Sequence, residues 1–295
     1  MKVDSSSQKS MKYPDVEDLS GLYKWKKIEV DQLGTCPQGF REIFEGNLDG
    51  FLIKNVMSQK ELQTFSKNFT SWHTKVKTPM PFGEFYGKKV NRSDGNFQKL
   101  ELGDYFSLSG VFREDLRNVF GFDIEKRIMQ TIHAVAEGVE VYVPKNDEGL
   151  TFIPSSVRVC KPYKGAIGSH VGNDFNYKMP EIQLLDSMAK LEGQLSYFLL
   201  LEQPESGGEL VLFDLLWPES PESISNQEQL GNEERDEVLD NLQKMHIAPQ
   251  AGDMILFAGG RIWHRVKDIG GSVDRITIGG FATFSRNEEK IIIWG

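Results

Sequence analysis

Apolar residues in the second half of the chain occur in short runs that glycine, proline and polar residues separate. Seven runs are rich in β-branched and aromatic residues, a composition that favours strands. They cover residues 155–163, 169–177, 194–202, 209–217, 253–260, 275–285 and 290–294. Many short strands with few long helices are typical of a double-sheet jelly roll. We therefore predict a mainly β fold with flanking helices, a double-stranded β-helix or cupin-like barrel.

The first half of the chain contains two segments with a helical pattern. Ser58 and Glu61 stand three residues apart before an amphipathic stretch, as in a capping box that begins a helix. A second helix is expected over residues 123–137, where the apolar residues near the helical period are Ile124, Ile128, Ile132 and Val135. Both helices are expected to pack on the outside of the barrel.

No internal repeat or linker divides the chain, so we predict one domain over residues 21–295, with the barrel core in residues 150–295. Residues 1–20 are polar and are expected to form a flexible arm. Two insertions interrupt the strand series, near residues 181–192 and 218–248. Insertions at a barrel mouth can serve as lids, and surface decoration is the alternative.

Composition narrows the class of protein. No apolar run approaches the ~18 residues of a transmembrane helix, and the N-terminus lacks the apolar stretch of a secretory signal, so a cytoplasmic protein without membrane contact is expected. Cys36 and Cys160 are the only cysteines and are expected to remain thiols. The formal net charge of −9 argues against a nucleic acid as partner.

The chain has five histidines, and they differ in their surroundings. His133 lies within a predicted helix near apolar residues and is expected to be packed. His73 and His246 lie in polar surroundings and are expected to be exposed. His170 and His264 each lie at the edge of a predicted strand, where a side chain can reach a barrel interior.

Arg275 follows His264 by eleven residues, and Thr277 returns to the same face of the predicted strand. Non-haem iron oxygenases bind iron through two histidines and one carboxylate. A 2-oxoglutarate user also needs a fixed cation for the distal carboxylate, and the planar fork of arginine binds a carboxylate through two hydrogen bonds. This ordered set predicts an iron and 2-oxoglutarate site.

The carboxylate of that site is missing from its expected position. Residue 172 returns to the face of His170 along a strand, and it is glycine. Asp174 faces the same side, but four strand residues span ~13 Å, too far for both side chains to bind one metal. A β-bulge that shortens this distance keeps Asp174 as an alternative ligand.

Several segments resemble a known family. KPYKGAIGSHVGND (161–174), GGELVLFDLLW (207–217) and DMILFAGGRIWHRV (253–266), with RITIGGF (275–281), are similar to iron(II)/2-oxoglutarate oxygenases. The His-x-Gly arrangement, with HVGNDF (170–175), QLSYF (194–198) and PESGGELVLFDLLW (204–217), resembles the freestanding halogenases that act on hapalindole- and welwitindolinone-type alkaloids. The resemblance is clear over residues 150–285.

The resemblance implies a metal centre and a reaction. Iron(II) would bind His170, His264, bidentate 2-oxoglutarate and chloride, with O2 as cosubstrate. Arg275 would hold the distal carboxylate of 2-oxoglutarate, with Thr277 as helper. In this family a chloro-ferryl species abstracts hydrogen from an unactivated aliphatic carbon, and chlorine rebounds onto the radical.

Three further residues receive roles from the resemblance. Gly172 would make room for the chloride, which fills the vacancy and supplies the negative charge that a carboxylate would bring. Asn173 would hydrogen-bond the chloride or a water beside it, or satisfy backbone groups. Ser196 would help to decide between transfer of chlorine and of hydroxyl; a buried serine bonded to backbone is the alternative.

The resemblance also bears on the substrate. A free small molecule, an alkaloid-like or other natural product, is expected without a carrier protein, and a nucleotide stays possible. Two other functions stay open. One is a hydroxylase or desaturase in which water or Asp174 completes the iron site. The other is a non-catalytic barrel that binds a small molecule or a protein. A zinc hydrolase is disfavoured because catalytic zinc usually has three protein ligands.

Overall fold

The computed structural model describes residues 17–19, 21–74, 76–87, 102–164, 167–173, 175, 177, 179–221, 224 and 232–295. Asp174 and most of the predicted arm lie outside these residues. Glu17–Leu19, at the end of that arm, form strand β1, which pairs with β2 (Trp25–Glu29).

Most strands belong to one large, mainly antiparallel sheet. Its strand order is β1-β2-β3-β13-β9-β16-β7-β5-β4, and β17 joins β16 to β6. The strands not yet bounded are β3 (Gly50–Lys54), β4 (Lys77–Met80), β5 (Gly83–Tyr86), β6 (Glu140–Tyr142), β7 (Ser156–Cys160), β9 (Leu195–Glu202), β13 (Met254–Phe257), β16 (Arg275–Phe284) and β17 (Lys290–Trp294).

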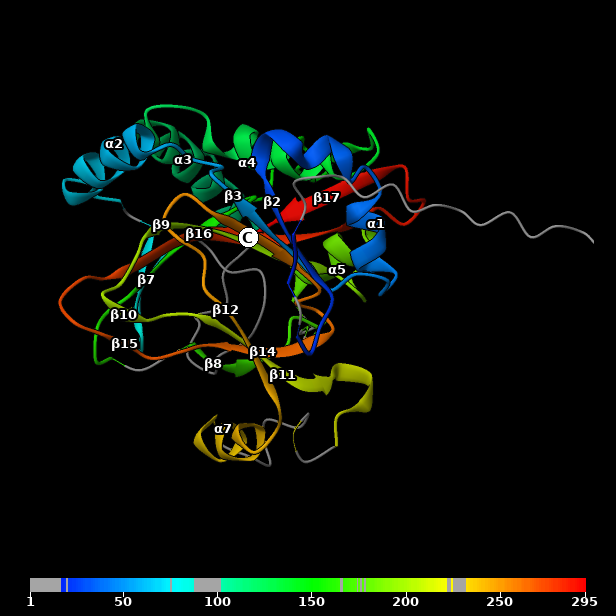
Figure 1. The fold of residues 1–295 in the computed structure, drawn as a ribbon. Coiled ribbons are helices and arrows are strands. Elements are labelled where there is room, and N and C mark those ends of the chain that lie inside the picture. The colour runs from blue at the N-terminus through cyan, green and yellow to red at the C-terminus, as the bar shows by residue number, and fades with distance from the viewer. Residues whose placement is uncertain are drawn as a thin grey trace, which may run out of the picture.

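A second sheet, of four strands, faces the centre of the large one (Figure 1). Its order is β12 (Lys244–Ile247), β11 (Leu210–Leu216), β14 (Ile262–Val266) and β8 (Ile167–His170). Along the chain, β7, β9, β13 and β16 of the large sheet alternate with strands of the small one. This crossing between two facing sheets is a jelly roll, so the predicted fold class is confirmed. A short pair, β10 (Ser206–Gly207) and β15 (Ile269–Gly270), lies beside the barrel.

Helices cover the outer face of the large sheet. In Figure 1, α2 (Gln59–Thr70), α3 (Leu102–Phe120) and α4 (Ile124–Ala134) lie above it, whereas α7 (Asn232–Asp240) lies below the small sheet. The remaining helices are η1 (Val30–Thr35), α1 (Gly39–Phe44), α5 (Pro180–Met188) and η2 (Trp217–Glu219).

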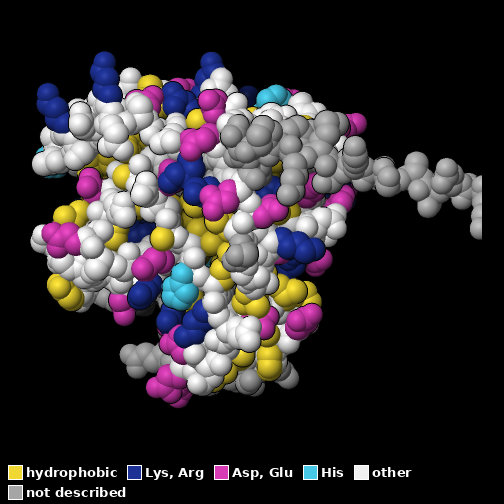
Figure 2. Space-filling view, in the orientation of Figure 1, with side chains coloured by type: hydrophobic (Ala, Val, Ile, Leu, Met, Phe, Trp, Pro, Cys, Tyr) yellow, Lys and Arg dark blue, Asp and Glu magenta, His cyan; other side chains and the backbone are white. Residues whose placement is uncertain are grey.

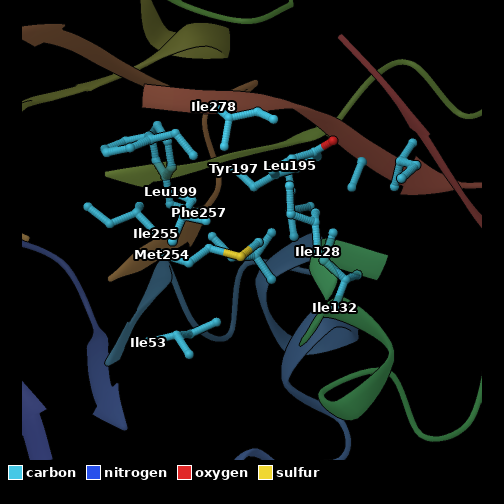
Figure 3. Packing of buried hydrophobic residues seen from close by; sticks show 14 of the residues in the cluster. Ile53, Ile128, Ile132, Leu195, Tyr197, Leu199, Met254, Ile255, Phe257 and Ile278 are labelled. Carbon is cyan, nitrogen blue, oxygen red and sulfur yellow. The ribbon is translucent and has the colours of Figure 1, made fainter. Parts of the chain in front are cut away.

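The core between helices and sheet follows the predicted periodicity. Ile128 and Ile132 of α4 are fully buried and lie near Met254 and Leu195 of the large sheet (Figure 3). Burial of each such side chain contributes about 2 kcal/mol. The start of α2 is also as predicted, since Ser58 and Glu61 form both hydrogen bonds of a capping box.

Several expectations were wrong in detail. The strand expected over residues 169–177 ends at His170, because the chain turns there towards α5. The second insertion is shorter than predicted, since β12 within it pairs with β11. His133 is exposed, because it lies in the last turn of α4, where its Nδ1 donates to the carbonyl of Val139 (2.8 Å).

His73 and His246 are exposed, and Cys36 and Cys160 are buried free thiols, as predicted. Charged side chains of both signs are interspersed on the face in Figure 2, which shows no extended basic area. None of the described helices combines the length and apolar character needed to cross a bilayer.

Candidate active site

Two histidines meet between neighbouring strands of the small sheet. His170, the last residue of β8, lies opposite His264 of β14, and their ring centroids are 4.3 Å apart. Each Nδ1 bonds to the carbonyl two residues earlier, of Gly168 and Ile262, at 2.8 Å. A carbonyl only accepts, so each Nδ1 carries the proton and each Nε2 carries the lone pair that a metal needs. The pair could therefore hold one metal ion.

His264 is neutral at ordinary pH. Its side chain is buried, and this burial lowers its pKa to about 4; the positive charge of Arg158 acts in the same direction, against the hydrogen bond to Ile262. A neutral imidazole is the form that binds a metal. Within the described residues, no group of three or more His, Cys, Asp or Glu side chains could hold a metal ion. His170 and His264 are thus the two candidate metal ligands in the described part of the chain.

Gly172 lies in the turn after β8, not on a strand as predicted. Its N–H donates to the carbonyl of Gly259 (2.8 Å), in the turn that connects β13 to β14. The turn after His170 is thereby joined to the turn before His264. The carbonyl of Gly172 accepts a hydrogen bond from Nε2 of Gln194, the residue that precedes β9.

The turn before His264 also lies against Ser196 and Asn173. A Cβ built on Gly259 would lie 2.1 Å from Oγ of Ser196, and one on Gly260 would lie 2.7 Å from Oδ1 of Asn173. Both glycines are therefore needed for this approach, since real Cβ atoms do not come within 3.0 Å of other atoms. Oδ1 of Asn173 is buried without a hydrogen-bond partner among the described residues.

Arg275 and Thr277 belong to the barrel face of β16. The sheet register pairs Gly279, on the same face, with Phe198 of β9, and the guanidinium of Arg275 lies 5.2 Å from the Phe198 ring. Nε of Arg275 donates to the carbonyl of Gly208 (2.9 Å), while Nη2 is buried without a partner in the described chain. Burial also lowers the pKa of Arg275. A desolvated cation with an unmet N–H fits a carboxylate ligand.

A second arginine faces the same interior. Arg158 of β7 is the cross-strand partner of Thr277. No carboxylate of the described residues pairs with it, and its charge acts on both His264 and Arg275. Arg158 is therefore close enough to both His264 and Arg275 for its charge to act on them.

Comparison with known proteins places the chain in a family. A model of the WelO5 family, the carrier-protein-independent halogenases, matches residues 22–295. The chain belongs to this family. It is thus an enzyme of the iron(II)/2-oxoglutarate-dependent oxidoreductase class, and the resemblance in the sequence is confirmed.

Solved structures also match the fold of this halogenase-family chain. An N-substituted L-amino acid dioxygenase from Burkholderia ambifaria AMMD matches it in two crystal structures, with TM-scores of 0.50 and 0.51 and 14% sequence identity. Each match covers 87% of this chain and 90% of the dioxygenase, and one of those crystals contains alpha-KG. At this identity the likeness shows the fold alone. No curated protein matches the chain.

Sequence reasoning missed three residues of the candidate site. Arg158 and Gln194 carry no spacing signal relative to the histidines, and only the sheet register and the packed turns bring them in. Phe257, whose ring centroid lies 4.9 Å from that of His264, is one of many apolar strand residues. The missed residues are therefore those whose position depends on contacts between distant segments.

Proposed function

We propose that this enzyme chlorinates an unactivated aliphatic carbon of a free small molecule, using iron(II), 2-oxoglutarate, O2 and chloride. The observation that carries the proposal is the His170–His264 pair together with glycine at position 172, two residues after His170, which offers no side chain as a third ligand. Two neutral histidines leave one more metal position open than the usual two histidines and one carboxylate do. An anion from solution can fill this position and balance the charge.

His170 and His264 hold the iron in this proposal. Both rings are oriented by their Nδ1–H bonds to backbone carbonyls, which keep each Nε2 lone pair available at a fixed angle. When bound, iron and 2-oxoglutarate supply the oxidation by O2 and the transfer of chlorine, and the protein supplies position and polarity.

Arg275 and Thr277 bind the distal carboxylate of 2-oxoglutarate. The unpartnered Nη2 of Arg275 and the buried hydroxyl of Thr277 are suitable donors at that end. Arg158, closer to the histidines, adds a positive charge near the metal-binding end of the same molecule. The two guanidinium groups thus match the two carboxylates of the cosubstrate.

Gly172, Asn173 and Ser196 surround the chloride side of the proposed centre. Gly172 adds no side chain that could replace the halide, and Asn173 provides an amide beside it. Ser196 presents a hydroxyl from β9 that can hydrogen-bond an oxygen ligand and hold it away from the substrate. This arrangement favours transfer of chlorine over hydroxyl.

The proposed substrate is an alkaloid-like or other apolar natural product that reaches the site without a carrier protein. Membership in a carrier-protein-independent family supports a free substrate. A nucleotide is the alternative that a phosphate requirement would reveal.

Anaerobic titration with iron(II) and 2-oxoglutarate, with and without chloride, tests the function. The iron-to-2-oxoglutarate charge-transfer band is expected to shift when chloride is added, in wild type and in the control His246→Ala, and to be absent in His170→Ala. A band that ignores chloride would instead favour the hydroxylase. A missing band in wild type would favour the non-catalytic barrel.

A further inference from the structure

Gln194 is the most enclosed polar side chain beside Gly172. It is fully buried, directly before β9. Its backbone N–H donates to the carbonyl of Leu191 (3.2 Å), and its backbone carbonyl accepts from Gly260 (3.0 Å). The side chain is thereby held between the turn that follows His170 and the turn that precedes His264.

The carboxamide of Gln194 occupies the volume of a side chain at position 172. A Cβ built on Gly172 would lie 2.6 Å from Nε2 of Gln194, 3.2 Å from the carbonyl oxygen of Gly259 and 3.3 Å from Cα of Gly260. The two backbone contacts require a shift of only a few tenths of an ångström, whereas the contact with Nε2 is shorter than real Cβ contacts are. Any residue other than glycine at 172 therefore has to displace the Gln194 amide.

The orientation of this amide is set by its partner. Nε2 donates to the carbonyl of Gly172, and the reversed amide would place two oxygens against each other. One Nε2–H is used in this bond and the second remains for another acceptor. Oε1 has no hydrogen-bond partner among the described residues. A buried amide with an unused N–H, in the volume where a carboxylate ligand would project, suits an anion that only accepts hydrogen bonds.

Resting on the proposed function, we propose that Gln194 is a halide-binding residue. It fills the space of the missing carboxylate side chain and donates its second Nε2–H to the metal-bound chloride. The same amide thus excludes a protein carboxylate from the third metal position and stabilises the anion that replaces it.

Chloride titration of the anaerobic iron(II)/2-oxoglutarate complex tests this role. In Gln194→Met the side chain keeps its length and loses both N–H groups. We expect the dissociation constant of chloride to rise about tenfold or more, since a hydrogen bond to a charged group is lost. Gln183→Met is the matched control, because Gln183 on α5 also donates to a backbone carbonyl, of Tyr177 (3.0 Å), but is exposed.

Iron affinity in the Gly172→Asp background gives a second test, because it does not depend on chloride. With Gly172 present, Gln194→Ala is expected to leave iron(II) binding unchanged or weaker. With Asp at 172, the same change is expected to strengthen iron(II) binding, because it frees the volume that the new carboxylate needs. A residue that only supports the fold would weaken binding in both backgrounds.

The outcomes separate this inference from the function on which it rests. If the wild-type band ignores chloride, the proposed halogenase fails. If the wild-type band responds and Gln194→Met binds chloride as wild type does, the role of Gln194 is overturned while the halogenase stands. Weaker iron binding of the Gly172→Asp protein on adding Gln194→Ala would overturn the steric part. Thermal melting of each variant verifies that it is folded.

Discussion

At the scale of single residues, three buried polar atoms of the candidate site lack a hydrogen-bond partner in the described part of the chain. Asn173 Oδ1, Gln194 Oε1 and Arg275 Nη2 are all buried and have no hydrogen-bond partner among the described residues. Each such group costs about 1–3 kcal/mol when nothing satisfies it. A carboxylate ligand can accept from Nη2 of Arg275 and offset its cost, whereas the two amide oxygens need a donor such as water.

The substitution Ser196→Ala tests whether this residue decides between hydroxylated and chlorinated product. If its hydroxyl restrains the oxygen ligand, Ser196→Ala raises the ratio of hydroxylated to chlorinated product, measured by mass spectrometry of turnover mixtures. Ser155→Ala is the control, because Ser155 is also buried but bonds to the hydroxyl of Tyr197 (3.0 Å) outside the proposed halide side. An unchanged ratio in Ser196→Ala would remove this role.

The substitution Arg158→Gln tests whether this second cation contributes to the binding of 2-oxoglutarate. Arg158→Gln removes a positive charge near the metal-binding end of 2-oxoglutarate, so the cosubstrate should bind about tenfold more weakly in the anaerobic titration. Arg113→Gln is the control, since that arginine pairs with Glu125 (2.8 Å) on the helical side. Equal affinity of Arg158→Gln and wild type would show that Arg275 binds the cosubstrate without it.

At the scale of elements, α7 holds the two strands that carry the histidines. The carboxylate of Asp236 accepts a hydrogen bond from the backbone N–H of Ser169 (3.0 Å), on the free edge of β8. The guanidinium of Arg235 lies 5.7 Å from the ring of Trp263, which precedes His264. The insertion thus contacts the residue before each histidine, and an edge strand of only four residues gains support.

Loss of the contact between α7 and β8 should weaken iron(II) binding. Asp236→Ala leaves the Ser169 N–H without its partner and loosens His170, so iron(II) affinity should fall about tenfold, as for other residues that orient metal ligands. Glu237→Ala, an exposed change on the same helix, should have no effect. Equal iron affinities of the two variants, measured by anaerobic titration, would contradict the support by α7.

The β4–β5 hairpin is attached to the barrel by a charge network that depends on pH. Burial of Glu84 opposes its charge, but hydrogen bonds from Lys77, Tyr86 and Lys161 outweigh this effect and lower its pKa to about 2. The folded state then binds the proton more weakly than the unfolded chain. The stabilising effect of the Glu84 carboxylate is complete above its ordinary pKa of 4.5 and is lost as pH falls towards 2.

Glu84→Gln should remove this acid sensitivity. The free energy of unfolding of wild type should fall more steeply between pH 4.5 and 2 than that of Glu84→Gln, by roughly 2 kcal/mol after allowance for solvent. Denaturant unfolding at several pH values measures the difference. Parallel curves for the two proteins would show that the network adds no net stability.

At the scale of the whole molecule, the proposed centre lies between the two sheets. The histidines belong to the small sheet, and Arg275, Thr277 and Arg158 belong to the large one. Iron and 2-oxoglutarate bound to both groups would connect the two layers. Ligand binding should therefore stabilise the fold as a unit.

Thermal unfolding measures this connection. At about 100 times the dissociation constant, iron(II) with 2-oxoglutarate adds about 2.7 kcal/mol, which should raise Tm by about 5 °C. His170→Ala should lose the shift, and His246→Ala, on the exposed face of β12, should keep it. A shift of equal size in His170→Ala would place the ligands elsewhere.

The sequence by itself predicted much of this protein, because strand and helix patterns are local. The β17 bounds, the capping box of α2 and the isoleucine stripe of α4 all follow from neighbouring residues. It also predicted the jelly roll, the family and the pair His170 and His264. What it predicted wrongly, the end of β8 and the extent of the second insertion, depends on pairing with strands distant in the chain.

Only the tertiary structure decided how the site is enclosed. Arg158 meets Thr277 through the register of β7 with β16, more than a hundred residues apart, and Gln194 meets Gly172 because two turns pack together. The spacing of residues along the chain does not predict such contacts, since hydrogen bonds and close packing act between atoms that are neighbours in space. The two histidines of the proposed iron site could be found from sequence, whereas Arg158 and Gln194, which enclose the site, could not.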